Sequence, residues 1–418
     1  MPGVGAGIGV STPPTLPPRW KLTKPAYSAQ FIYPAVSHYN TPKSNAMEKI
    51  MYEILEIIED YRAETKDGVS INDIELWISQ FDKEEREFIL EETRNILDNT
   101  YCPKNVAFDL FKDLIEFSAN NFKYKDVASF LDETEFLSLQ NYGKSQTIMI
   151  EMFEDLFMTN YNYDLQNRKK KTIKNYIYID DVLCTGSTLY HDISQWLNKK
   201  INGQPRHQLI VEKEQNIIFA YMIIHKENYQ KKINQIQHNF GEGIIPRITM
   251  IRGVVIDNSS NKPLSKCEIV KPINENLSDY TIEYKKQIID LVDNYVAGKY
   301  PTKDDFFRKP YIPIIEGLYS SKENRKRIER IFLEKGIDIL NKTVNQTNKQ
   351  IRPLGYSLPS HKNFGFGALC FNWRNVPNTT PLVFWYNGGG FIPLFKRYQQ
   401  TNDPNARIAH ILNKIKRK

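Results

Sequence analysis

The chain has 418 residues, of which 41% are apolar and 25% are charged. This length allows two or three domains, and the composition excludes a wholly disordered chain. No apolar run approaches the ~18 residues that a membrane-spanning helix needs, so we expect no membrane partner. The four cysteines lie far apart without a CxxC pair, which excludes a disulfide scaffold and argues against a structural zinc site. We therefore expect a protein of the reducing cytoplasm.

The net charge of +7 is unevenly distributed. Residues 1–46 hold four basic residues and no acidic one, whereas the remaining 372 residues hold 52 basic and 49 acidic residues. A protein that wraps duplex nucleic acid normally carries a larger excess of positive charge. Binding to nucleic acid through local basic patches stays open.

Residues 1–46 differ in composition from the rest of the chain. They contain 8 of the 22 prolines, and Ser44-Asn45-Ala46, a common cloning remnant, stands directly before Met47. We expect residues 1–46 to be a leader that is disordered or was appended by cloning. A native proline-rich tail is the alternative.

Helical spacing begins at Met47. Ile50, Ile54 and Ile57 recur at the spacing of one helix face, and Ser70 is placed to cap a second helix that carries Trp77. Further apolar repeats predict helices around residues 88–96 and 110–115. We expect residues 47–130 to form a helical module.

Strands and helices then alternate. Short apolar runs predict strands at residues 136–139, 176–179, 217–224 and 248–256, separated by helices at 146–157, 188–197 and 229–240. Such alternation is typical of a parallel sheet with crossover helices. The expected fold is α/β, with a parallel sheet core over residues 131–320.

The last hundred residues have a mixed pattern. We expect helices at residues 280–296 and 321–332, and a strand at residues 381–386 followed by a turn at Gly388-Gly389-Gly390. Residues 321–418 are expected to form a C-terminal α+β extension that packs on the core.

Residues 176–188 read YIYIDDVLCTGST and carry the clearest chemistry. Asp180 and Asp181 follow an apolar strand, and Thr185, Gly186, Ser187 and Thr188 lead into a helix. The loop at the carboxyl end of a parallel strand is where α/β proteins bind ligands, and a helix N-terminus with hydroxyl groups binds anions. Carboxylates accept hydrogen bonds from sugar hydroxyls. The segment predicts a ribose 5-phosphate site, and the alternative is that the two aspartates cap the helix.

This segment resembles the phosphoribosyl-diphosphate (PRPP) motif of type I phosphoribosyltransferases. The resemblance implies that Asp180 and Asp181, the expected catalytic residues, bind the ribose hydroxyls and that the residues from Thr185 to Thr188 bind the 5′-phosphate. It also implies a Mg²⁺ ion held by the ligand's diphosphate and ribose, with no metal ligand from the protein itself. Two residues depart from the usual pattern: Tyr178 replaces an aliphatic residue, and Cys184 replaces a small or hydroxylated one.

Three segments together resemble one branch of that family. The residues are WISQF at 77–81, YIYIDDVLCTGSTL at 176–189 and NVPNTTP at 375–381 followed by PLFKR at 393–397. They are similar to the orphan phosphoribosyltransferase-like proteins of bacterial conflict (anti-phage) systems, some of them linked to retrons. The resemblance implies a type I phosphoribosyltransferase-like effector that transfers or cleaves a glycosyl bond of PRPP or a nucleotide. Its expected partners are that ligand and a reverse transcriptase with its RNA–DNA or another defence subunit.

Two other functions stay open at this stage. The same fold could serve as a non-catalytic sensor of PRPP or nucleotides, or as a ribonucleoprotein subunit that uses its basic clusters. One cluster, at residues 322–330, is expected to form a basic helix face, and another lies at residues 414–418.

Three further segments are candidates for parts of the site. Gly143, Lys144 and Ser145 correspond to a diphosphate loop or to an ordinary capped helix start, and a Walker A motif is excluded because residue 138 is serine. Arg168, Lys169, Lys170 and Lys171 correspond to a mobile basic loop over the leaving diphosphate or to a solvated loop. Asn375, Asn378 and Arg397 either lock a turn or complete a base pocket, with Trp373 or Trp385 stacking on the base.

Overall fold

The computed structural model describes residues 46–65, 67–140, 145–168, 171–299, 301–302, 304–344 and 347–397. The expected leader, apart from Ala46, and the basic residues at 414–418 lie outside this part of the chain. The described residues form one compact unit. None of the described helices is long and apolar enough to cross a membrane.

A four-stranded parallel sheet forms the centre of the α/β part, in the order β2-β3-β6-β7. The strands are β2 (Thr134–Phe136), β3 (Asn175–Leu183), β6 (Asn216–His225) and β7 (Ile248–Ile256). The connections between them contain α6 (Ser145–Tyr161), α7 (Ser187–Asn198), α8 (Arg206–Glu212) and α9 (Lys226–Phe240). The predicted α/β class with a parallel sheet is therefore confirmed.

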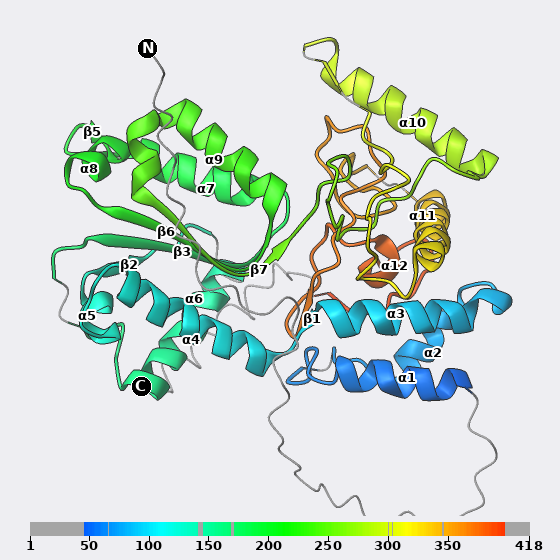
Figure 1. Ribbon diagram of the computed structural model, residues 1–418, viewed down its shortest axis with the longest axis horizontal. Coiled ribbons are helices and arrows are strands. Elements are labelled where there is room, and N and C mark those ends of the chain that lie inside the picture. The colour runs from blue at the N-terminus through cyan, green and yellow to red at the C-terminus, as the bar shows by residue number, and fades with distance from the viewer. Residues whose placement is uncertain are drawn as a thin grey trace, which may run out of the picture. The chain divides into compact units, whose positions relative to one another are not determined.

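Helices cover both faces of this sheet (Figure 1). On one face, Tyr178 and Phe219 pack in a cluster with Leu189 and Ile193 of α7 and Ile236 of α9. The other face is covered by α6, by α4 (Lys104–Asn121) and by α5 (Val127–Asp132) (Figure 1). Because both faces are buried, β6 is apolar along nearly its whole length.

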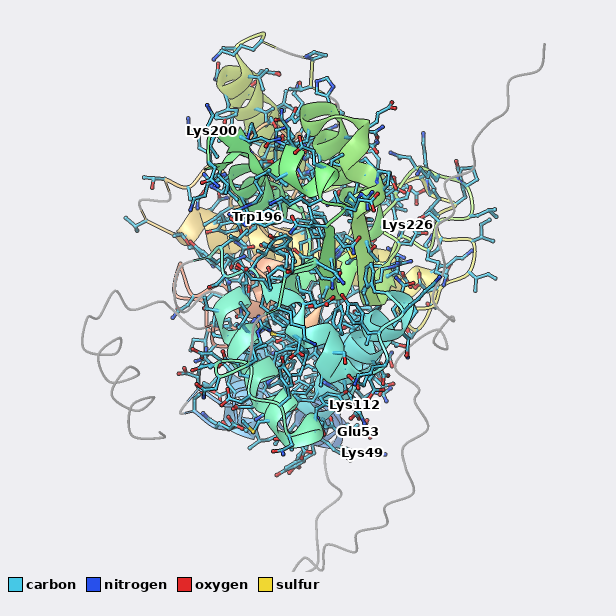
Figure 2. All side chains as sticks on the ribbon, turned by 90° about the vertical axis from the view of Figure 1, so that its left-hand side faces the viewer. Lys49, Glu53, Lys112, Trp196, Lys200 and Lys226 are labelled. Carbon is cyan, nitrogen blue, oxygen red and sulfur yellow. The ribbon has the colours of Figure 1, made fainter. Side chains whose placement is uncertain are left out.

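A second apolar cluster joins the N-terminal helices to the C-terminal part of the chain. It contains residues from α1 (Ala46–Ile57), α2 (Ile71–Ser79), α3 (Arg86–Thr100), α10 (Asp279–Val296), α11 (Lys322–Lys342) and α12 (Leu382–Trp385). Trp77 is fully buried, and its Nε1 donates a hydrogen bond to the carbonyl of Val383 at 2.7 Å. Ser70 caps α2 as expected. On the surface, Lys49 and Glu53 of α1 form an i,i+4 ion pair (Figure 2).

A short ladder connects these two parts of the fold. The two residues of β1 (Tyr101–Cys102) pair in parallel with those of β8 (Phe371–Asn372). His225, at the end of β6, lies with Nδ1 2.9 Å from the carbonyl oxygen of Leu183 and packs edge-on against Phe366. These contacts bring the segment around β8 to the carboxyl end of β3.

Two expectations for the C-terminal part of the chain were wrong. Residues 381–386 do not form a strand: the extended Pro381 precedes the one-turn helix α12, whose four residues are all buried, so no alternation of apolar and polar residues marks it. The basic cluster of α11 does not lie on one solvent face, because Arg325 is buried and paired with Glu329 and Glu316.

Smaller elements complete the description: the 3₁₀ turns η1 (Lys83–Glu85) and η2 (Glu242–Arg247), and the hairpin of β4 (Lys200–Ile201) and β5 (Gln204–Pro205). The domain boundaries expected from the sequence stay a prediction. The packing shows that α4, inside the expected helical module, contacts β6 and β7.

Candidate functional site

The DD segment lies inside a strand and not after it. β3 continues through Asp180 and Asp181 to Leu183, and α7 begins at Ser187 after a three-residue connection. The two aspartates accept hydrogen bonds from the backbone N–H groups of Asp181 and Val182 at 3.0 and 2.8 Å. No described hydrogen bond joins either carboxylate to the first turn of α7, so the aspartates do not act as its caps.

A pocket of about 170 Å³ opens at this end of β3. A water molecule needs ~10–15 Å³ of such volume, so the pocket can hold a group of sugar-phosphate size. It is lined by Ser145, by Asp180 to Gly186, by Thr188, Leu189 and Tyr221, and by Asn375, Pro377, Asn378 and Thr379. The structure thus brings both predicted aspartates and most of the predicted phosphate loop to one cavity.

Asp180 is buried, with 6% of its surface exposed. Burial, followed by the neighbouring carboxylate of Asp181, raises the pKa of Asp180 to about 7, and a hydrogen bond from the Ser145 side chain partly opposes this rise. A carboxyl group whose pKa is raised by burial and a neighbouring carboxylate is typical of a functional site, whereas a carboxylate in a structural ion pair has a lowered pKa.

Asp181 has a different environment. Its Oδ2 forms an ion pair with the guanidinium of Arg374, and the amide of Asn372 lies 3.5 Å from the same oxygen. Both partners come from the segment around β8. Asp181 therefore both lines the pocket and holds the C-terminal segment against β3.

The loop before α7 has the geometry of an anion site. Gly186 adopts a left-handed φ of +70°, and a Cβ atom there would lie 2.7 Å from Cγ of Lys232. The backbone N–H of Ser187 donates to Oγ1 of Thr185 at 3.3 Å, and Thr188 also lines the pocket. The free N–H groups and the dipole of a helix N-terminus favour a phosphate at this position.

The two residues that depart from the PRPP pattern occupy different places: Tyr178 lies within β3, and Cys184 is the first residue of the connection to α7. The Tyr178 hydroxyl donates to Oδ2 of Asp192 at 2.8 Å and accepts a hydrogen bond from Nε2 of Gln140 at 2.9 Å. Burial raises the pKa of the Cys184 thiol to about 12, so this thiol stays protonated near neutral pH. Neither residue obstructs the cavity: Tyr178 does not line it, and Cys184 forms part of its wall.

The remaining predicted loops are only partly described. Gly143 and Lys144, and Lys169 and Lys170, lie outside the described residues. Ser145 reaches the pocket. Of the basic loop, Arg168 donates to the carbonyl of Leu131 at 2.9 Å, and Lys171 pairs with Asp132 at 3.0 Å. Both are held against α5, and neither lines the pocket. A role of these loops at the diphosphate stays a prediction.

The C-terminal segment supplies one wall of the pocket, which we call the C-terminal wall: Asn375, Pro377, Asn378 and Thr379. Asn375 and Asn378 line the pocket as expected, whereas Arg397, Trp373 and Trp385 do not. The guanidinium of Arg397 stacks on Trp385 at 4.6 Å, and Nε1 of Trp385 donates to the carbonyl of Thr380, the residue after the wall, at 2.7 Å.

Two residues at the site, Tyr221 and Arg374, were not expected from the sequence. Tyr221 lines the pocket from β6, where it reads as one more apolar strand residue. Arg374 pairs with Asp181 across 193 positions of sequence. Arg374 is a single cation in an aromatic, apolar segment. A buried cation is stable only beside an anion, so the sequence offered this one indication that Arg374 forms an ion pair.

The described residues hold no group of three or more metal-ligating side chains. The pocket supplies two carboxylates, and one of them is paired with Arg374. A Mg²⁺ ion bound here would therefore take most of its ligands from the oxygen atoms of a diphosphate and from water.

A parallel α/β sheet with two adjacent aspartates and a glycine-containing loop at the end of one strand is the arrangement that the sequence led us to expect of a phosphoribosyltransferase-like protein. A family model named PRTase-CE matches residues 74–397. The chain belongs to this phosphoribosyltransferase-like family. No curated protein and no solved structure shows a significant match.

Proposed function

We propose that the pocket binds the ribose 5-phosphate part of PRPP or of a nucleotide and that the protein transfers or hydrolyses its glycosyl bond. The observation that carries the proposal is the arrangement of one pocket: the buried carboxyl of Asp180 and the N-terminal loop of α7 line the same cavity. A sugar phosphate presents both hydroxyl donors, which a carboxylate accepts, and an anion, which a helix N-terminus binds. The family membership supports the same class of activity.

Each part of the pocket has a distinct task. The loop from Thr185 to Thr188 binds the 5′-phosphate through backbone N–H groups and hydroxyls, and Asp180 accepts a hydrogen bond from a ribose hydroxyl. The C1′ bond to diphosphate or base breaks, the electron pair leaves with that group, and an acceptor or water forms the new bond at C1′ and loses its proton. A Mg²⁺ ion on the diphosphate would neutralise the charge of the leaving group.

As a more specific part of the proposal, we infer that the protein acts as an effector of anti-phage defence. It is supported by the likeness of the three segments at residues 77–81, 176–189 and 375–397 to proteins of conflict systems. A reverse transcriptase with its RNA–DNA, or another defence subunit, would then be the partner, and the cytoplasm the compartment.

A non-catalytic sensor is the second candidate, and one observation favours it. The Asp181–Arg374 pair links the pocket directly to the C-terminal segment, so a ligand that draws Asp181 away from Arg374 would loosen that segment. Saturable PRPP binding without product would identify a sensor.

The test is the double variant Asp180→Asn with Asp181→Asn. Calorimetry with PRPP and Mg²⁺ measures binding, and release of diphosphate or of free base from nucleotides measures turnover. We expect the variant to lose both binding and turnover, while Asp290→Asn, an exposed change on α10, keeps both. Binding and turnover that match the unmodified protein would reject the sugar-phosphate pocket.

A further inference from the structure

The exposed basic residues of α11 take no part in the proposed function, yet they line a pocket of their own. Lys326, Arg327 and Arg330 face a cavity of about 240 Å³, which lies between α11 and the loop that leads into α10. We call this cavity the α11 pocket. It is larger than the pocket at β3 and shares no lining residue with it. A water molecule needs ~10–15 Å³ of such volume, so the α11 pocket has room for a side chain of another molecule.

Part of the α11 pocket is an apolar surface that exists before any ligand binds. Ile273 and Leu333 are buried, and Leu277 is partly exposed, and all three line the cavity. The loop is fixed next to this surface, because the N–H of Arg308 donates to the carbonyl of Pro272 at 3.0 Å. A preformed apolar cavity of this kind suits an aliphatic side chain.

The cations of the α11 pocket differ in how they are paired. Lys326 pairs with Glu275 at 3.5 Å, and Arg327 pairs with Glu85 of η1. Arg330 is exposed and forms no ion pair or hydrogen bond with the described part of the chain. Its guanidinium is therefore free to bind a carboxylate.

Two more polar side chains of the α11 pocket are free. Glu323 has no partner among the described residues, and it precedes Arg330 on α11 by about two turns, or ~10 Å. An anion is therefore expected at the Arg330 end of the cavity, away from Glu323. The exposed amide of Asn276 also bonds to no described residue, and it can both donate to and accept from a peptide backbone.

From this arrangement we infer that the α11 pocket docks an extended segment of another protein, in which an aliphatic residue stands close to an acidic one. The aliphatic side chain packs against Ile273 and Leu333, and the carboxylate pairs with Arg330. The amide of Asn276 bonds to the backbone of the segment. Arginine side chains commonly recognise acidic motifs in this way. The inference does not depend on the sugar-phosphate proposal.

The lining favours a protein over a nucleic acid. None of the described residues that line the α11 pocket is aromatic, so no ring is available for the base stacking on which single-strand binding relies. The ends of this chain outside the described residues are also poor ligands. Residues 1–45 hold no acidic residue, and residues 398–418 hold one acidic and five basic residues. The acidic segment is therefore expected from another protein.

The test is an array of short synthetic peptides, each with one aliphatic and one acidic residue at a different spacing in a glycine–serine background. Fluorescence anisotropy measures their affinity for the unmodified protein. We expect a subset to bind saturably, and to lose about tenfold in affinity when the acidic residue is replaced by its amide. Replacing the aliphatic residue by serine should cause a similar loss. Added salt should weaken binding, because the ion pair lies near solvent.

Variants of Arg330 test the position of the carboxylate. Arg330→Gln should weaken the bound peptides about tenfold, and Arg330→Lys, which keeps the charge, should retain most of the affinity. Arg330→Glu should lose these peptides and bind counterparts in which lysine replaces the acidic residue. Lys213→Gln, an exposed change after α8, controls for the loss of a positive charge elsewhere. Thermal melts check that each variant folds.

Three outcomes would overturn the inference. The first is an array in which no peptide binds more tightly than its amide counterpart. The second is a peptide affinity that Arg330→Gln and Lys213→Gln change equally. The third is an oligothymidylate that binds more tightly than every peptide and is weakened by Arg330→Gln, because the α11 pocket would then be a nucleic-acid site.

Discussion

Asp180→Asn is expected to stabilise the fold at alkaline pH. The pKa of Asp180 rises from 3.8 to about 7 because the carboxyl is buried beside Asp181. The folded state therefore holds its proton up to near pH 7, whereas the unfolded state loses it near pH 4. Stability from this group is present below pH 4 and is lost as the pH rises towards 7. The shift corresponds to at most ~4 kcal/mol, and relaxation around the buried charge reduces it to about 1–3 kcal/mol.

Urea denaturation at pH 8 and pH 5 measures this effect, with the difference between variant and unmodified protein cancelling other titrating groups. Asp180→Asn should gain about 1–3 kcal/mol at pH 8 and less than half of that gain at pH 5. Asp290→Asn is the control and should change little at either pH. A loss of stability at pH 8, or a gain that does not depend on pH, would show that Asp180 is an ordinary structural carboxylate and refute the reasoning.

Three further changes test the surroundings of the pocket. Gly186→Ala should lower the free energy of unfolding, measured by thermal melts, by about 1–2 kcal/mol, because of strain at φ +70° and a close contact with Lys232. Adding Lys232→Ala should recover only the share of this loss that comes from the contact. A double-mutant cycle of Asp181→Asn and Arg374→Gln should give a coupling energy of about 1–3 kcal/mol, because both side chains are mostly buried; a value near zero would mean that the pair does not anchor the C-terminal wall. Gln146→Ala should lower the denaturation midpoint, because Oε1 of Gln146 accepts from the N–H groups of two residues before α6, and an unchanged midpoint would contradict that role.

Local patterns were enough to predict the sheet and the motif. The apolar runs of β3, β6 and β7 and the amphipathic α7 and α9 are properties of short segments, and so is the Ser70 cap. The position of Thr185, Gly186 and Thr188 at a pocket follows from a glycine and hydroxyl residues at a helix start, and their binding of a phosphate stays a prediction. Each of these features depends only on residues that are close together in the chain, so it can be predicted from a single sequence.

The surroundings of the aspartates depend on tertiary contacts and could not be predicted. A strand was expected to end where charged residues begin, yet β3 continues to Leu183 because its backbone stays paired with β6, and the charge of Asp181 is paired with Arg374 of the C-terminal segment. The Arg374 contact joins residues 193 positions apart, and no local pattern encodes it. The helix α12 escaped prediction because it is buried on all sides and has no periodicity.

The most direct test of the central claim is a calorimetric titration of ribose 5-phosphate, with ribose as the reference, into the unmodified protein and the Thr185→Val, Thr188→Val variant. The account predicts saturable binding of the phosphate ester by the unmodified protein, a loss of at least tenfold in the variant, and no measurable binding of ribose alone. Equal binding of the phosphate ester to both proteins would contradict a phosphate site at the start of α7.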